Sequence, residues 1–521
     1  MRYEYNSPLK DKFNRVAFYR PGAISQLLTT GQLTTPDGQR IVIPPGGRAP
    51  RGLVYVGDPD PVLGGTVPVG GIEPDKNNFA PRVGFAWSLG SPENSFFRRI
   101  LGTDQTVLRG GFGVYYGAVI GDTALQQLSA PGYNGTNFFQ FPASGTLADL
   151  FAPDPYPAWG GDQGTVPNPF AASSFNVSAP LGQMSQPIDP NIRTPYTLQW
   201  NLTLERGFAR DYVIGLSYVG NRGRKLYVRE QVNPALGTFF PTTLRTEPTP
   251  APTTGNSNSR RLNDDIRIGL VQLTTGSNST YDAFQANFQK RMSDNGLLFQ
   301  LAYTFSKSIN DSDSQRGQLD LLDRSAGRGL SDDDVPHRFV GSFIYELPFF
   351  KNTSGFVKRV VDGWSIGGIY TYQSGRVFSV GNPIDIDGTG GALINFADLG
   401  TGTYTALDGV DNDRRGFNAD AFAIANCGSN FALCGGVGRR GTSGRNQFRL
   451  DNPINQWDAI LAKRIKLFSE SNYLELRFEA FNLLNTTQFT TINLNLSSPN
   501  FGVYTDTRES RSIQLGARLA F

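Results

Sequence analysis

Closely spaced aspartates in two glycine-containing segments could bind a metal ion. Asp408, Asp411 and Asp413 lie within Asp-Gly-Val-Asp-Asn-Asp, and Asp385 and Asp387 lie within Asp-Ile-Asp-Gly. Spaced carboxylate oxygens are ligands that calcium uses, although neither segment has the distal glutamate of an EF-hand loop. Aspartate-rich turns are also common in exposed loops. The first cluster is therefore a candidate calcium site, with a simple solvated turn as the alternative.

The remaining residue types give little indication of catalysis. His337 is the only histidine, so a two-histidine metal site or a Ser-His-Asp triad would have a single candidate base. The glycines of Gly111-Phe112-Gly113 lie in an expected strand with no helix after it, which excludes a dinucleotide loop. Glu475 and Glu479 flank Arg477 on one strand face, where a polar interior explains them without acid–base chemistry. We expect no enzymatic activity, and no cofactor besides the candidate calcium ion.

Composition favours strands over helices. The 521 residues include 60 Gly, 37 Phe and 20 Tyr but only 3 Met, which is typical of aromatic-rich strands joined by glycine-rich turns. The net charge is only +3 and there is no basic stripe, so nucleic acid is not an expected partner. No apolar stretch approaches the roughly 18 residues of a membrane-spanning helix. Cys427 and Cys434 could form a small disulfide or remain two free thiols.

The elements that must position these residues are strands in which apolar and polar residues alternate. Between Tyr196 and Arg206, every second residue is Tyr, Leu or Trp and the residues between them are polar. This period of two is typical of a strand with a different environment on each side. Adding a stub at Arg2 to Tyr5, the pattern predicts about twelve strands. They are hairpins of 83–87 with 108–114, 196–206 with 212–218, 284–288 with 297–305, 339–345 with 364–372 and 457–461 with 474–480, and a last strand at 513–521.

The connections between these strands alternate in length. Short turns are expected at 88–105, 207–211, 292–296, 347–363 and 468–472, and long loops at about 7–81, 117–195, 221–280, 308–336, 374–456 and 482–510. Outer-membrane barrels place short turns on the periplasmic side and long loops outside the cell. The fold class predicted is all-β: a transmembrane antiparallel β-barrel that occupies residues 1–521 as one domain, with outer-membrane lipid around it.

Charged side chains favour one face of the expected strands. On a lipid-facing side, each Arg or Lys near the midplane would cost about 2–4 kcal/mol. Lys290 and Lys463 are the exceptions on the apolar face, and both lie toward periplasmic ends, where a long stem can snorkel to the headgroups. The run Asp332-Asp333-Asp334 is interpreted as solvated loop charge. The charges on the polar face are Glu205, Arg338, Glu346, Glu475, Arg477, Glu479 and Arg518.

Several phrases resemble the TonB-dependent outer-membrane receptors, in particular the Oar-like group. The resemblance runs from the first residues to Phe521. It is carried by Asn78-Phe79-Ala80-Pro81-Arg82-Val83-Gly84-Phe85-Ala86-Trp87, Val107-Leu108-Arg109-Gly110-Gly111-Phe112-Gly113, Val335-Pro336-His337-Arg338-Phe339, Tyr345-Glu346-Leu347-Pro348-Phe349 and Arg477-Phe478-Glu479-Ala480-Phe481-Asn482-Leu483-Leu484-Asn485.

The resemblance implies a gated importer of a large ligand, energised by the TonB complex, with a 22-stranded barrel around a plug. The chain departs from this pattern because it begins inside a strand and shows neither plug nor TonB box. We therefore expect a truncated receptor that contacts the TonB complex only through a missing N-terminal region. An open wall of about twelve strands would leave free edges at Arg2 and at Ile513 to Phe521. The ligand cannot be named from these residues.

Two groups of aromatic residues have expected roles in membrane placement. Tyr196, Trp200, Trp364, Tyr372 and Trp457 are expected at the membrane–water boundary on the outer face, as in aromatic belts. Phe521 ends the chain after an alternating strand, which resembles the C-terminal signal read by the barrel-assembly machinery.

The sequence therefore predicts a protein of the bacterial outer membrane. A simple porin, which needs no plug, is one alternative. A secreted or surface β-rich adhesin or hydrolase is another, and it would have its apolar strand faces covered by other elements.

Overall fold

The structure is a computed structural model. It describes residues 1–90, 105–117, 174–181, 187–312, 318–319, 327–348, 361–382, 396–409, 414–424, 441–467 and 472–521, apart from 9, 11, 13, 15, 35–39, 178, 238–239, 253–255, 267–268 and 294. Among the residues described, no helix is long and apolar enough to cross a membrane.

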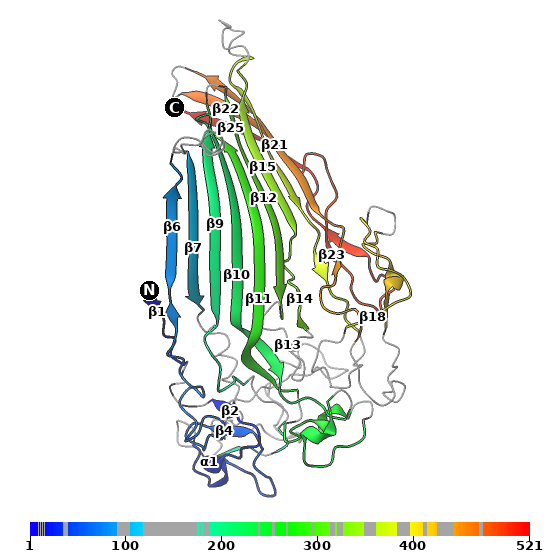
Figure 1. The fold of residues 1–521 in the computed structure, drawn as a ribbon. Coiled ribbons are helices and arrows are strands. Elements are labelled where there is room, and N and C mark those ends of the chain that lie inside the picture. Colours follow the sequence, from blue (N-terminus) through cyan, green and yellow to red (C-terminus); the bar gives the residue numbers. More distant parts are fainter. Residues whose placement is uncertain are drawn as a thin grey trace.

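The dominant element is one curved antiparallel sheet (Figure 1). Each long strand pairs with the next along the chain, as expected of hairpins. Two short strands, β13 (Gln318–Leu319) and β14 (Gly329–Leu330), pair with β10 and β12. The long strands are β6 (Arg82–Ser88), β7 (Thr106–Tyr116), β9 (Tyr196–Phe208), β10 (Tyr212–Gln231), β11 (Val271–Lys290), β12 (Leu297–Asn310), β15 (His337–Glu346), β16 (Trp364–Gln373), β21 (Ile454–Lys466), β22 (Tyr473–Phe481) and β25 (Ser512–Ala520).

The pairing register confirms the alternation predicted for the strands. Leu216 on β10 lies opposite Leu204 on β9 and Ala286 on β11, so apolar residues share one face across neighbouring strands. No other layer of described residues covers this apolar face: the exposed fraction reaches 62% for Trp87 and 78% for Leu515. A water-soluble sheet would bury such a face against other elements. The sheet therefore has the form of a wall whose apolar side requires an apolar surrounding.

As far as the described residues show, the wall is open, and its two edge strands run in the same direction. Eleven long strands pair in series, all antiparallel, from β6 at one edge to β25 at the other. An odd number of alternating strands leaves the first and last parallel to each other. Within the described residues, β6 and β25 are not paired with each other. The expected stub at Arg2 to Tyr5 is not a wall strand: β1 (Arg2–Tyr3) pairs only with β5 (Phe79–Ala80), just before β6 begins.

Strands β10 and β11 are longer than the sequence pattern suggested. Each has 20 residues, and they stay paired from Tyr212 with Lys290 to Gln231 with Val271. The expected loop at 221–280 is therefore wrong in its bounds, and the connection comprises residues 232–270. The alternation fades beyond Gly220 because the strands leave the region with one apolar side, while backbone pairing continues.

Two folded lobes lie at the long-loop end of the wall (Figure 1). Lobe A comprises the described residues within 16–75, 174–192 and 232–270. Its buried core includes Tyr19, Ile41, Leu53, Ile266 and Leu270, which come from distant parts of the chain. Its elements are β2 (Ala17–Tyr19) paired with β4 (Leu53–Tyr55), β3 (Arg40–Val42) paired with β8 (Ser174–Asn176), α1 (Gln26–Thr29) and the 3-10 helices η2 (Thr242–Leu244) and η3 (Ser257–Arg260).

Lobe B comprises the described residues 377–382, 396–409, 414–424, 441–450 and 489–507 and has an aromatic core. Phe378 stacks on Phe417 with ring centroids 5.0 Å apart, and Phe422 meets Phe448 edge to face at 4.8 Å. Such pairs add stability beyond simple burial. Its elements are β17 (Val377–Phe378) with β20 (Phe448–Arg449), β18 (Asp398–Leu399) with β19 (Phe422–Ala423), β23 (Phe489–Ile492) with β24 (Tyr504–Thr507), and the 3-10 helix η5 (Ala419–Ala421).

Candidate functional site

The five residues predicted to form an aromatic belt all share the parity of the apolar face. Four lie toward the long-loop ends of their strands, and Trp364 lies at the short-turn end of β16. Trp457 stacks on Tyr370 with centroids 4.5 Å apart. The ring of Tyr196 lies 5.7 Å from that of Tyr116. Tyr372 pairs in register with Phe339. The ring of Trp200 lies 5.0 Å from the guanidinium of Arg222. Their position at a membrane boundary stays a prediction.

Lys290 and Lys463, the two expected exceptions on the apolar face, bind the short turns. The ammonium group of Lys290 donates to the side chains of Ser293 and Asn295 and to the carbonyl of Leu297, at 2.8–2.9 Å. Lys463 donates to the carbonyl of Asp362 and lies 5.4 Å from the Trp364 ring. Both lysines are at most 5% exposed. The expectation that they snorkel to headgroups is therefore wrong, because turn carbonyls and side chains solvate the charge locally.

The polar face carries a compact ion network near the short turns. Glu475 is 6% exposed and accepts from Arg464 Nη2 at 3.1 Å and from Arg477 Nε. A buried carboxylate held between two guanidiniums is already satisfied as an ion. This arrangement positions strands β21 and β22 relative to each other, and it offers no free acid or base.

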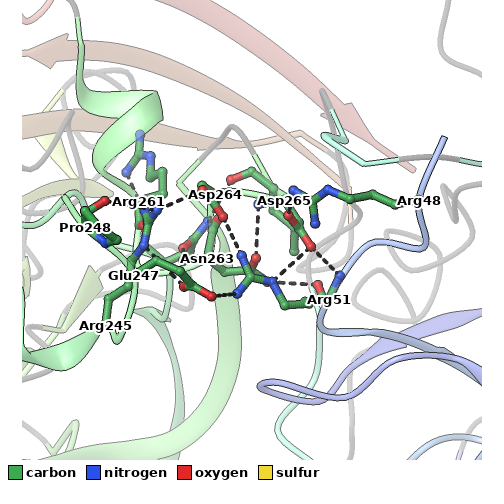
Figure 2. A network of polar contacts seen from close by, with 11 residues as sticks. Arg48, Arg51, Arg245, Glu247, Pro248, Arg261, Asn263, Asp264 and Asp265 are labelled. Atoms are coloured by element: carbon green, nitrogen blue, oxygen red, sulfur yellow. Dashed lines mark hydrogen bonds and ion pairs between the residues drawn. The ribbon is translucent and has the colours of Figure 1, made fainter. Parts of the chain in front are cut away.

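A larger polar network fixes the folded loops of lobe A (Figure 2). Arg51 donates through Nη2 to Asp264 Oδ1 at 2.6 Å, through Nε to Asp265 Oδ2 at 3.1 Å, and through Nη1 to Glu247 Oε1 at 2.9 Å. Its backbone N–H also donates to Asp265 Oδ2 at 2.8 Å. Arg48 forms a further ion pair with Asp265. Segments more than 200 residues apart are thereby joined by one guanidinium.

The carboxylate of Asp265 is charged and enclosed at the centre of this network. Its side chain has an exposed fraction of 0%. Burial acts to raise the pKa of Asp265, but hydrogen bonds from Arg48 and from Arg51 outweigh burial, and the pKa lies below its usual value. The chemistry of the network is structural: it holds residues 48–51 against residues 263–265.

A second buried ion pair stabilises the same lobe. Arg20 and Asp60 both have an exposed fraction of 0%, and Arg20 Nη2 lies 2.8 Å from Asp60 Oδ2. Backbone N–H groups of Val62 and Leu63 also donate to Asp60. Burial acts to raise the pKa of Asp60, yet the Arg20 and backbone hydrogen bonds hold that pKa below its usual value. Lobe A is thus ordered by two enclosed aspartates.

The structure describes only one of the candidate calcium ligands. Asp408 is described, whereas Asp411, Asp413, Asp385 and Asp387 lie outside the described residues. Cys427 and Cys434 also lie outside them. Within the described residues, no group of three or more potential metal ligands comes together. The calcium site stays a prediction.

Two other polar residues differ from, or add to, the sequence interpretation. Asp334 is 2% exposed and accepts from the Ser308 backbone N–H at 2.6 Å and from Arg449, so its interpretation as a solvated charge is wrong. The partner Arg449 lies 115 residues away in lobe B, which no local pattern could indicate. His337 begins β15, and its Nδ1 lies 2.8 Å from Tyr303 Oη on the neighbouring strand.

Phe521 follows β25 and is 96% exposed. Its recognition by the barrel-assembly machinery stays a prediction.

The sequence analysis did not identify the residues of the lobe networks, because their partners are distant in the sequence. The high density of Arg and Asp at 245–265 was the one signal that could have indicated them.

The fold and its uncovered apolar face define an outer-membrane wall, and the family comparison agrees. Residues 1–514 match the family described as outer membrane beta barrel domain, and the chain belongs to that family. It is a protein of the bacterial outer membrane. A search of curated proteins finds no match.

Solved structures of outer-membrane transporters are similar to this chain. The transporter YddB of Escherichia coli aligns with a TM-score of 0.43 and 10% identity over 89% of this chain and 42% of its own. The unliganded ferric citrate transporter FecA gives 0.35 and 9% over 89% and 40%. The ferric-catecholate import receptor Fiu of E. coli gives 0.36 and 10% over 92% and 38%. The chain spans about two fifths of the length of these proteins.

Proposed function

We propose that this chain forms part of the wall of a TonB-dependent receptor that imports a large ligand across the outer membrane. The proposal rests on the family membership, on the receptor-like phrases of the sequence, and above all on the open eleven-stranded wall. Catalysis has no part in this proposal. The imported ligand, the plug and the contact with the TonB complex are parts of the proposal, and none of them is formed by the described residues.

The direction of the edge strands supports a larger barrel. In lipid, every backbone N–H and C=O must be paired, and a closed barrel achieves this. Because β6 and β25 run in the same direction, an all-antiparallel barrel can close only through an odd number of further strands. Although β1 is not a wall strand, its pairing of Arg2 with Ala80 and of Tyr3 with Phe79 places a short partner just before β6, which supports a further neighbour on that side. A barrel of 22 strands, the number that the family resemblance implies, encloses a lumen wide enough for a plug.

The polar face is suited to line such a lumen. Ser342, in the middle of β15, lies on the polar face, whereas its neighbour Phe343 lies on the apolar face. A receptor fills the space beside Ser342 with polypeptide, while an open porin fills it with water. The occupant of this space therefore separates the two functions.

A photo-crosslinking experiment in intact cells tests the proposal. The full gene product would carry a photoreactive phenylalanine analogue at position 342, with position 343 as the matched control. We expect position 342 to cross-link to a peptide outside the wall strands, identified by mass spectrometry, and position 343 to cross-link to lipid. Absence of any peptide cross-link at 342, with a normal level of folded protein, would support the porin and contradict the receptor.

A further inference from the structure

A group of cations faces outward at the long-loop end of β10. Arg222 and Arg224 share the parity of Tyr218 and of the apolar face. Lys225 follows with a backbone φ of +52°, where the pairing of β10 with β11 shifts register. Left-handed backbone is unfavourable for lysine, and a bulge of this kind re-aims a side chain. Lys225 Nζ consequently lies 5.9 Å from the ring of the outward-facing Tyr196.

Aromatic rings on the neighbouring strand β9 contact two of these cations. The Arg222 guanidinium lies 5.0 Å from the Trp200 ring and forms an ion pair with Asp282 at 2.9 Å. Tyr218 Oη donates to the same carboxylate at 2.7 Å. Lys307 stands opposite Asp282 on the next strand and is exposed. Among the residues that the structure describes, the outward side chains of these strand ends thus include four cations, Arg222, Arg224, Lys225 and Lys307, against the carboxylate of Asp282. We call these four residues the cation patch.

The cation patch lies where the headgroups of the outer leaflet should be. Ten residues separate Tyr212, at the short turn, from Arg222, which at about 3.3 Å per residue is about 33 Å along the strand. With a strand tilt of about 40°, this length rises about 25 Å, the height of the apolar band of an outer-membrane barrel. The patch is therefore at the level of the lipid phosphates, on the side that faces lipid.

Within the described part of the chain, the two cations that follow Arg222 have no acidic partner. Among the described residues, no carboxylate lies within ion-pair distance of Arg224 or Lys225; Arg224 donates to the carbonyls of Gly223 and Ser279. A guanidinium fixed by backbone carbonyls keeps further N–H donors for an anion, and Arg and Lys both bind phosphate. A strained lysine beside it is difficult to explain by stability alone.

We propose that the cation patch binds a phosphate-bearing lipid headgroup of the outer leaflet. Arg224 and Lys225 contact the phosphate, and Trp200 and Tyr196 lie at the boundary between the headgroup and the acyl chains. This site faces lipid and is separate from the lumen of the proposed receptor.

Lipid titration of the purified full chain in zwitterionic detergent tests the proposal. The probe is a fluorescent diphosphorylated glycolipid, compared with the same glycolipid after removal of its phosphates. The variant combines Arg224→Gln with Lys225→Asn, because asparagine tolerates the left-handed backbone. The matched control combines Arg109→Gln with Arg338→Gln, which removes two cations from the polar face. Heat-modifiable mobility verifies that each variant is folded.

We expect the patch variant to bind the phosphorylated probe about 25-fold more weakly than the unchanged chain. The control should bind normally, and the dephosphorylated probe should bind the unchanged chain as weakly as the variant binds the phosphorylated one. Equal binding by variant and unchanged chain would overturn the proposal. Equal binding of both probes by the unchanged chain would also overturn it, because the phosphates would then not be what the site recognises.

Discussion

At the scale of single residues, enclosed charges determine how the loops are held. Asp265 is fully buried between Arg48 and Arg51, and Asp334 is buried against Arg449. Removing one partner of a buried ion pair leaves a charge without compensation, which costs more than the pair itself contributes. These contacts join segments that are far apart in the sequence, so the alternation pattern could not predict them.

Replacing Arg51 by alanine should loosen lobe A. Asp265 would keep its ion pair with Arg48 but lose the hydrogen bond from the Arg51 guanidinium. Asp264 and Glu247 would lose their ion pairs with Arg51. Because Arg51 is partly exposed, we expect a loss of about 1–3 kcal/mol in the stability of the lobe. Hydrogen exchange of the amides at 48–55 and 263–270 measures this loss.

The control for this substitution is Arg193→Ala, which removes an exposed pair with Glu73. An exposed pair contributes about 0–1 kcal/mol, so exchange in the lobe should hardly change. Equal exchange in the Arg51 variant and the unchanged chain would show that the network does not hold the lobe.

Acid should release the same contact, in a defined direction. The pKa of Asp265 is lower in the folded lobe than its usual value, so its contribution is fully present above about pH 4 and is lost as pH falls through the lowered pKa. The protection of amides 263–270, taken as the ratio of the intrinsic to the observed exchange rate at each pH, should stay high from neutral pH to about pH 5 and fall only in stronger acid. A loss of protection that is already complete near pH 6 would contradict a lowered pKa.

At the scale of elements, periodicity predicted the wall strands but not all of their ends. Tyr196 to Arg206 alternates strictly, and β9 spans Tyr196–Phe208. The same alternation did not predict the part of β10 that follows Gly220, because Arg222 and Arg224 occupy outward positions where apolar residues were expected. The lobe strands are two to four residues long, too short for any period to be read. Their positions depend on tertiary packing.

The last strand provides a test of membrane assembly. Deletion of Phe521 should lower the amount of chain in the outer membrane while synthesis continues, because the terminal aromatic residue resembles the barrel-assembly signal. Immunoblots of membrane and total fractions measure this ratio. The exposed substitution Glu509→Ala serves as the control. Normal membrane levels of the deletion variant would show that Phe521 is not needed as an assembly signal.

At the scale of the whole molecule, one side of the sheet must be in lipid. Exposed apolar residues lie on this face from β6 through β7, β9, β10, β11 and β12 to β16, β21, β22 and β25, and water would not tolerate so large an apolar surface. An arginine in the middle of this face, such as Leu216→Arg, should therefore destabilise the inserted protein by about 2–4 kcal/mol. The neighbouring Ser217→Arg, on the polar face, should cost much less. The midpoint of urea unfolding, followed by heat-modifiable mobility, measures the difference.

The most direct test of the wall is a nitroxide scan of β10 from Tyr212 to Arg222 in outer membranes. Each position would be labelled singly through cysteine, in a chain with Cys427 and Cys434 replaced by serine. Collision with oxygen reports lipid, and collision with a water-soluble nickel chelate reports an aqueous or polar surrounding. We predict that even-numbered positions collide with oxygen and odd-numbered positions do not, with the oxygen signal declining at Arg222. A profile without this alternation, or with the two faces reversed, would contradict the assignment of the apolar face to lipid.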